Sequence, residues 1–171
     1  MCDHGASCHF HDSVSSSVAQ SLDELEFQRG IWQAALDNDY ARVNALIRKG
    51  VSPNTPDTYG YTALHYACRS GHEQIAMLLL ENGADPNAKT ASGKECPIHR
   101  AAYQGHEAIV RLLLKKGADP TIQSSDGQTA LHKAGQRDKQ AVIKILLEAA
   151  PDLDSIRDNK GNTALTSSEE R

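Results

Sequence analysis

The hydrophobic residues of this chain fall into pairs of short stretches that have helical spacing. Residues 60–87 show one complete pair. The first stretch carries Leu64 and Ala67, and the second runs from about Glu73 to Asn82 with its apolar residues on one stripe. That stripe consists of Ile75, Leu78 and Leu79. A glycine follows each stretch, at 71 and 83, and we expect both to end a helix with a positive φ.

The same pattern recurs along the chain with a nearly constant period. The glycines that open successive units are separated by 33, 34 and 34 residues. They are Gly60, Gly93, Gly127 and Gly161. One helix pair cannot bury its own apolar face, so units of this length must stack on their neighbours. The period therefore predicts one domain built as a stack of repeats.

Short motifs accompany the period. They are Thr62-Ala63-Leu64-His65, Gly71-His72, Leu78-Leu79-Leu80 and Gly83-Ala84-Asp85. With them, the chain resembles the ankyrin-repeat family over roughly residues 27–165. The resemblance implies an all-α fold, an ankyrin-repeat solenoid of stacked helix-turn-helix units with β-hairpin-like fingers. It also implies an N-terminal capping repeat, three full repeats and a C-terminal half repeat.

We expect six segments along the chain. They are a disordered Cys/His- and Ser-rich tail (1–20), an N-terminal capping helix and capping repeat (21–58), three ankyrin repeats (59–91, 92–125, 126–159) and a partial C-terminal capping repeat (160–171). The capping repeat keeps the register of the full repeats. Ile31 and Ala34 occupy the inward positions of its first helix, and Asn38 takes the place of the helix-ending glycine.

The later repeats depart from this pattern. In the second full repeat, Lys94-Glu95 replaces a single residue, so its finger is expected to bulge. In the third, Gly135 lies inside the first helix and Asp138 replaces the helix-ending glycine, so we predict that this is the loosest full repeat. In the last unit we expect a first helix only, with residues 167–171 capping the preceding layer. That layer contains Val142, Ile145 and Leu146.

Composition and charge argue against several classes of function. The 171-residue chain has a formal net charge of −4, too small to indicate nucleic-acid or membrane binding. No apolar run approaches the ~18 residues of a spanning helix, and the start does not resemble a signal peptide. Four cysteines without a disulfide-type pattern favour a reducing compartment, the cytosol or nucleus. We also expect the chain to be a monomer.

No group of residues suggests catalysis or cofactor binding. The chain lacks a Gly-rich phosphate loop, a G-x-S-x-G motif and a paired-carboxylate motif, so we expect no enzyme activity and no cofactor. His65, His99 and His132 recur one repeat apart, about 10 Å between packed layers, which is too far to share a metal. The family resemblance implies that they tie the turn through hydrogen bonds. Cys96 begins a helix, whose dipole could lower the thiol pKa, but no base is positioned to use it.

The N-terminal tail suggests an alternative function. Cys2, His4, Cys8 and His11 are metal-ligating residue types that lie close together in the sequence and could form a small zinc site. Against this, the cysteines do not have the C-x2-C spacing of common zinc sites, and so short a loop has few residues to orient the ligands. In this alternative the protein is a regulatory zinc binder, and the repeats serve as a scaffold.

One asparagine is a candidate for modification. Residues 79–87, LLENGADPN, follow the L-x5-[DE]-x-N pattern that asparaginyl hydroxylases of ankyrin proteins favour. By resemblance, Asn87 is a candidate for β-hydroxylation. The simpler interpretation is that the Asn87 side chain shapes the finger through a local hydrogen bond. Both can hold.

The surface expected to act is the concave face, defined here as the side lined by the fingers and the first helix of each repeat. Solenoids use such faces to hold partners. Its outward positions are Tyr59, Tyr61, Tyr66, Arg69, Arg100, Tyr103, Lys133 and Arg137. Tyr and Arg are enriched at binding hot spots, and four of the eight are basic. We therefore expect a non-enzymatic adaptor that binds an acidic or phosphorylated protein segment; otherwise the basic positions only form a solvated face.

Overall fold

The computed structural model describes residues 30–165, in which the helices are short and follow one another in pairs. Residues 30–36 form a helix that is followed by α2 (Tyr40–Arg48). The next pairs are α3 (Ala63–Ser70) and α4 (Glu73–Glu81), α5 (Pro97–Gln104) and α6 (Glu107–Lys115), and α7 (Ala130–Gln136) and α8 (Gln140–Ala149). A 3₁₀ helix, η1 (Pro151–Ser155), follows α8.

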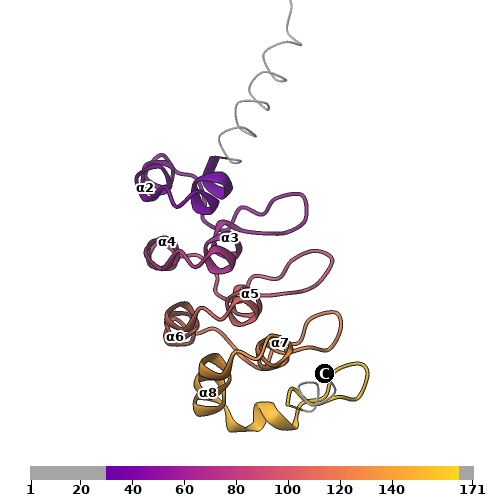
Figure 1. The fold of residues 1–171 in the computed structure, drawn as a ribbon. Coiled ribbons are helices and arrows are strands. Elements are labelled where there is room, and N and C mark those ends of the chain that lie inside the picture. Colours follow the sequence, from indigo (N-terminus) through magenta and orange to yellow (C-terminus); the bar gives the residue numbers. More distant parts are fainter. Residues whose placement is uncertain (1–29, 166–171) are drawn as a thin grey trace, which may run out of the picture.

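The helix pairs stack in two rows (Figure 1). In the first row α3 packs against α5 and α5 against α7, and in the second row α2, α4, α6 and α8 pack in succession. Long loops, the predicted fingers, extend beside the first row (Figure 1). Within residues 30–165, β pairing is limited to one antiparallel bridge between Arg157 and Thr163. The predicted all-α solenoid is therefore confirmed.

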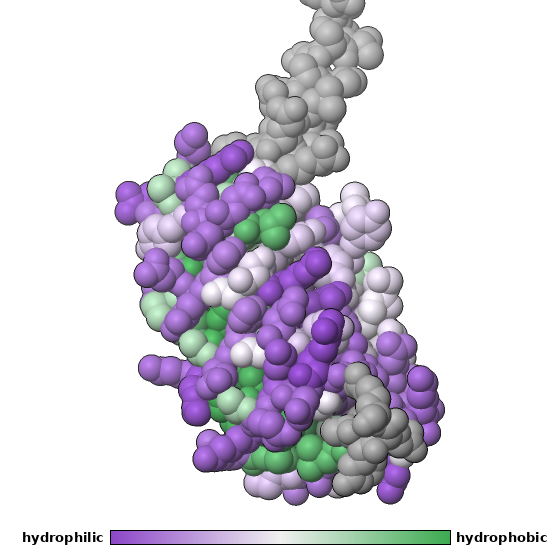
Figure 2. All heavy atoms as spheres, viewed as in Figure 1, coloured by the Kyte–Doolittle hydropathy of each residue, from purple (hydrophilic) through white to green (hydrophobic). Residues whose placement is uncertain are grey.

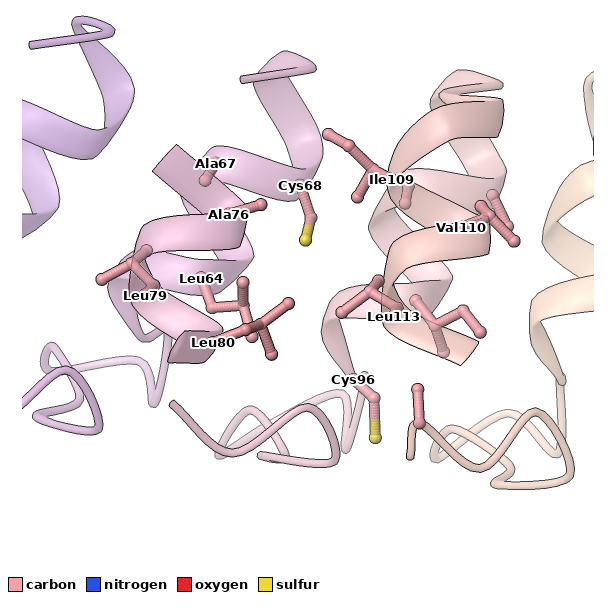
Figure 3. Packing of buried hydrophobic residues seen from close by; sticks show 14 of the residues in the cluster. Leu64, Ala67, Cys68, Ala76, Leu79, Leu80, Cys96, Ile109, Val110 and Leu113 are labelled. Carbon is pink, nitrogen blue, oxygen red and sulfur yellow. The ribbon is translucent and has the colours of Figure 1, made fainter. Parts of the chain in front are cut away.

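Apolar layers between successive helix pairs form the core. Each layer is filled by side chains with almost no exposed surface, such as Leu64, Leu79, Ile98, Leu113, Leu131 and Leu146. Figure 3 shows side chains of neighbouring repeats directed into one such layer. Each buried Leu or Ile contributes about 1.5–3 kcal/mol relative to its exposed state. Cys68 lies in this layer as a small apolar residue, because burial raises the pKa of its thiol well above the usual value.

Left-handed residues end the first helices, as predicted. Gly71 has a φ of +83°, and a β-carbon at this position would lie 2.7 Å from the ring of His106. Asn38 and Asp138 take the same conformation with φ values of +60° and +52°. Asn and Asp are among the residues that tolerate it best. The repeat register therefore holds even where glycine is missing.

The C-terminal end of the second row is covered by a feature that the sequence did not suggest. Helix α8 ends at Ala149, and Pro151 begins η1, which packs against α8. Leu153 of η1 is fully buried. Residues 167–171, which we expected to cap this layer, lie outside the described residues, and the described part of the last unit, up to residue 165, has turns and no helix. Within residues 30–165, η1 covers α8 instead.

The surface of the stack is mainly hydrophilic. Hydrophilic residues cover most of the side seen in Figure 2, and hydrophobic surface appears in small separate areas between them. None of the helices within residues 30–165 has the length and apolarity needed to cross a membrane.

Candidate interaction surface

The eight residues predicted to bind a partner come from three successive repeats. Tyr59 and Tyr61 lie on the first finger, Tyr66 and Arg69 on α3, Arg100 and Tyr103 on α5, and Lys133 on α7, with Arg137 directly after it. Tyr59, Arg69 and Arg137 are exposed, and the other five are half-buried. Whether these residues bind a partner stays a prediction, but the structure shows which of them are in contact.

Asp57 organises the tyrosines of the first finger. Its Oδ1 accepts hydrogen bonds from the backbone N–H groups of Tyr59 (2.9 Å) and Tyr61 (2.8 Å), and its Oδ2 accepts one from the Tyr66 hydroxyl at 2.7 Å. Burial, followed by this bond to Asp57, raises the pKa of Tyr66 to about 12. The Tyr61 ring lies 5.8 Å from the Tyr66 ring and 5.5 Å from the ring of His65. The sequence analysis did not select Asp57 as part of the face.

Arg100 joins this aromatic cluster to the next repeat. Its guanidinium carbon lies 5.2 Å from the centroid of the Tyr61 ring, within cation–π range. Its Nη2 donates to the Tyr61 hydroxyl and lies 2.8 Å from Glu95 Oε2. The buried Nε has no hydrogen-bond acceptor among the described residues. Arg100 is therefore held firmly in place, with one donor left unsatisfied.

Glu95 is, after Asp57, the second residue of this face that was not among the predicted positions. One carboxylate oxygen pairs with Arg100 and the other lies 2.8 Å from Lys133 Nζ, so the carboxylate bridges α5 and α7. The exposed fractions of the Glu95 and Lys133 side chains are only 13% and 14%. Burial disfavours the ionised carboxylate, but the bond from Lys133 and the charges of Lys133 and Arg100 outweigh it, so the pKa of Glu95 lies below its usual value.

Glu95 reaches this position because the second finger is one residue longer. In the first finger the N–H of Asp57 bonds the carbonyl of Tyr61, whereas in the second finger the N–H of Thr90 bonds the carbonyl of Glu95. The additional residue shifts the left-handed conformation to Lys94, whose φ is +48°. This confirms the predicted irregularity of the finger.

A pocket of about 320 Å³ opens beside the ion pairs that Glu95 forms with Arg100 and Lys133. It is lined by Glu95, His99, Arg100, Tyr103, Lys133 and Gln136. The guanidinium carbon of Arg137 lies 4.4 Å from the centroid of the Tyr103 ring. Five of the eight predicted residues thus belong to contacting clusters around Tyr61, Glu95 and Tyr103, and Tyr66 joins them through the Tyr61 ring. Tyr59 and Arg69 lie exposed on the first finger and α3.

The repeated histidines tie neighbouring repeats together. In His65, Nδ1 accepts from the backbone N–H of Thr62 at 3.1 Å, so Nε2 carries the proton and donates to the carbonyl of Glu95 at 3.0 Å. His99 and His132 make the matching bonds to the carbonyls of Gln128 and Asn162. In the capping repeat Trp32 replaces the histidine, and its indole N–H donates to the carbonyl of Thr55 at 2.9 Å. The predicted structural role of the histidines is confirmed.

No metal site was found among residues 30–165, where His, Cys, Asp and Glu side chains do not gather in groups of three or more that could hold an ion. The alternative zinc ligands Cys2, His4, Cys8 and His11 lie outside the described residues. For Cys96 the sequence expectation is corrected. Burial is the main effect on its thiol and raises the pKa to about 11, so the helix start does not produce a reactive thiolate.

The side chain of Asn87 connects two repeats through hydrogen bonds. Its Nδ2 donates to the carbonyl of Gly117 at 3.1 Å, and its Oδ1 accepts from the N–H of Asp119 at 2.8 Å. Asn54 makes the same pair of bonds one repeat earlier. The bond that shapes its own turn is instead donated by its backbone N–H to Asp85. Hydroxylation of Asn87 stays a prediction, which peptide mass spectrometry of the cellular protein would contradict if no added oxygen is found at this residue.

Comparison with known proteins agrees with this geometry. The family described as "Ankyrin repeats (3 copies)" matches residues 31–124 and 98–170. Human ankyrin repeat domain-containing protein 39 is 51% identical over 83 residues, which are 48% of this chain and 45% of that protein. The bovine protein of the same name is 57% identical over 65 residues, 38% of this chain and 36% of its own.

More distant relatives match over smaller shares of their own length. Mouse ankyrin repeat domain-containing protein 40 is 36% identical over 78 residues, 45% of this chain and 21% of that protein. Mouse 2-5A-dependent ribonuclease is 37% identical over 70 residues, 40% of this chain and 10% of that protein. In each case the matched segment spans less than half the length of the relative. With the family match covering most of its length, the chain belongs to the ankyrin-repeat family.

Proposed function

We propose that this protein is a non-enzymatic adaptor that binds a segment of a protein partner on its concave face. Ankyrin repeats are generally protein-interaction modules, which supports the coarser part of the proposal. The observation that carries the finer part is a series of side-chain contacts that joins aromatic and basic residues of three repeats. It runs from Tyr66 and Tyr61 to Arg100, and from Arg100 through the carboxylate of Glu95 to Lys133.

The chemistry of this face favours an acidic or phosphorylated segment. The predicted positions include four basic residues, Arg69, Arg100, Lys133 and Arg137, whereas the carboxylates in contact with these clusters are Asp57 and Glu95. A surplus of positive charge therefore remains on a chain of net negative charge. The tyrosines supply rigid apolar contact area beside it.

No observation favours an enzymatic alternative. The match to the mouse ribonuclease covers 10% of that protein, and it gives no basis for nuclease activity in this chain. The buried free thiols of Cys68 and Cys96 support the further proposal that the protein works in the cytosol or nucleus. Imaging of a tagged protein in a secretory compartment would contradict that location.

The test is capture of cellular proteins by the tagged full chain, quantified by mass spectrometry. The variant Tyr61→Ala/Arg69→Glu/Tyr103→Ala alters the concave face. The matched control Tyr40→Ala/Arg111→Glu alters exposed residues of α2 and α6 in the second row. We expect a small set of proteins to be captured by the wild type and the control and lost from the concave-face variant, after circular dichroism shows that each is folded.

The opposite pattern would reject the proposal. If the same proteins bind the concave-face variant as strongly as the wild type, the face is only a solvated surface. Loss from the second-row control alone would place binding on the outer helices.

A further inference from the structure

Arg100 and Lys133 carry two positive charges, and both pair with the single negative charge of Glu95. Both lie 2.8 Å from the carboxylate of Glu95, which contacts them with separate oxygens. Two cations facing one carboxylate leave a net positive charge beside the pocket that all three residues line.

The backbone of Glu95 is fixed by hydrogen bonds, while its carboxylate forms ion pairs with Arg100 and Lys133. Its N–H donates to Thr90 Oγ1 at 3.0 Å, and its carbonyl accepts from His65 Nε2 at 3.0 Å. Rotation of the side chain would therefore release Arg100 and Lys133 without moving the finger. A partner carboxylate that takes the place of the Glu95 carboxylate would keep both cations paired, so the exchange does not leave a buried positive charge without a partner.

We infer that Glu95 is an internal competitor, whose carboxylate occupies the subsite formed by Arg100 and Lys133 where an acidic side chain of the partner binds. This inference rests on the proposed function of the concave face. A partner carboxylate entering the pocket would pair with the same two cations while Tyr103 forms the wall of the pocket. Glu95 would then suppress binding of weakly acidic segments, because only a ligand that outcompetes it gains the full charge of the pair.

The experiment measures binding of a fluorescein-labelled polyglutamate peptide to the full chain by anisotropy at low salt. Glu95→Gln is expected to bind the probe at least about fivefold more tightly than the wild type, because one negative charge leaves the subsite. Adding Arg100→Gln and Lys133→Gln to this variant should abolish that gain. Glu107→Gln on α6 removes an equal charge from an exposed position in the second row and should match the wild type.

Three outcomes would overturn the inference. If Glu95→Gln binds like the wild type while Arg100→Gln/Lys133→Gln loses binding, Glu95 is only a structural tie, and the acidic-segment function stands. If Glu107→Gln gains as much as Glu95→Gln, the effect is one of net charge. If none of the variants alters binding, both the competitor and the proposed acidic specificity fail.

A folding control keeps the result interpretable. Glu95 also joins α5 to α7, so Glu95→Gln can lower thermal stability, which circular dichroism will report at the temperature of the binding assay. Glu95→Asp retains the charge but is one methylene too short to reach both cations from the same backbone position. It should give a gain in probe binding smaller than that of Glu95→Gln; a gain equal to it would also contradict the inference.

Discussion

At the scale of single residues, each buried histidine forms hydrogen bonds through both nitrogens of its ring. His65 caps its own helix through Nδ1 and holds the next finger through Nε2, and His99 and His132 repeat this geometry. Both ring nitrogens are in use only while the ring is neutral, because Nδ1 must accept a hydrogen bond. Protonation would therefore break the tie within the turn as well as place a charge in the core.

Stability should consequently depend on pH. Burial, the largest effect, lowers the pKa of His65 from 6.5 to about 4 and also lowers that of His99. Between about pH 4 and pH 6.5, the unfolded chain binds more protons at His65 than the folded chain does. The free energy of unfolding therefore rises with pH in this range. This stability is complete above about pH 6.5 and is lost as the pH falls towards 4. His65 alone should account for a loss on the order of 3 kcal/mol.

Urea unfolding at about pH 7.5 and about pH 5 measures this slope. His65→Gln should be less stable at neutral pH and should show a shallower slope. His72→Gln, which removes another histidine of the same repeat that is only partly buried, is the matched control. Equal slopes for His65→Gln and the wild type would contradict the explanation.

At the scale of elements, the fingers show how one added residue gives its neighbour new contacts. In the second finger the left-handed residue is Lys94, whereas Gly93, the glycine that marks the repeat period, does not have a positive φ. With the added residue, the carboxylate of Glu95 lies between Arg100 of α5 and Lys133 of α7. The finger accepts a lysine in a conformation that costs most side chains about 1 kcal/mol or more.

Substitutions in the fingers should follow these backbone angles rather than the motif. Lys94→Gly is expected to raise the free energy of unfolding by about 0.5–1 kcal/mol, because it relieves the left-handed strain. Gly93→Ala should stay within about 0.5 kcal/mol of the wild type. Its β-carbon would have no neighbour closer than 3.5 Å. Gly60→Ala should be clearly destabilised, since its β-carbon would lie 2.4 Å from the backbone nitrogen of Ala91.

Thermal and urea denaturation of the three variants provide the check. A stabilised Gly93→Ala with an unchanged Lys94→Gly would show that the left-handed residue has been placed wrongly.

The sequence was sufficient for the fold because the repeat period and its motifs lie in the chain itself. The bulge was also predictable, since Lys94-Glu95 adds a residue at a defined place. The role of Glu95 was not, because the direction of its side chain depends on how α5 and α7 pack. Helix η1 was missed for a simpler reason. Pro151 by itself indicates only the end of a helix, but the apolar Leu153 in an otherwise polar loop is a signal that a second buried element follows.

At the scale of the whole molecule, two of the series of side-chain hydrogen bonds that connect neighbouring repeats stop at the third full repeat. Asn54 and Asn87 bridge successive repeats, but Thr121, at the next equivalent position, bonds Asp119 within its own turn. His72 and His106 bond carbonyls of the preceding repeat, and Lys139 replaces the next histidine. On the concave side, the ion pair between Glu95 and Lys133 connects the second and third full repeats in place of these missing hydrogen bonds.

We therefore keep the prediction that the third full repeat is the loosest. Native-state hydrogen exchange should give lower opening free energies for amides of α7 and α8 than for those of α3 to α6. Equal values throughout, at the global free energy of unfolding, would show that the stack opens as a single cooperative unit.

Helix η1 also determines how this array can be lengthened. Because η1 packs against α8 with its own Leu153 buried, the site where the second helix of a further repeat would pack is already occupied. Consensus repeats grafted after residue 165 would have no apolar layer to join in the second row. An extended array would need to replace residues 151–165, starting from the last turn of α8.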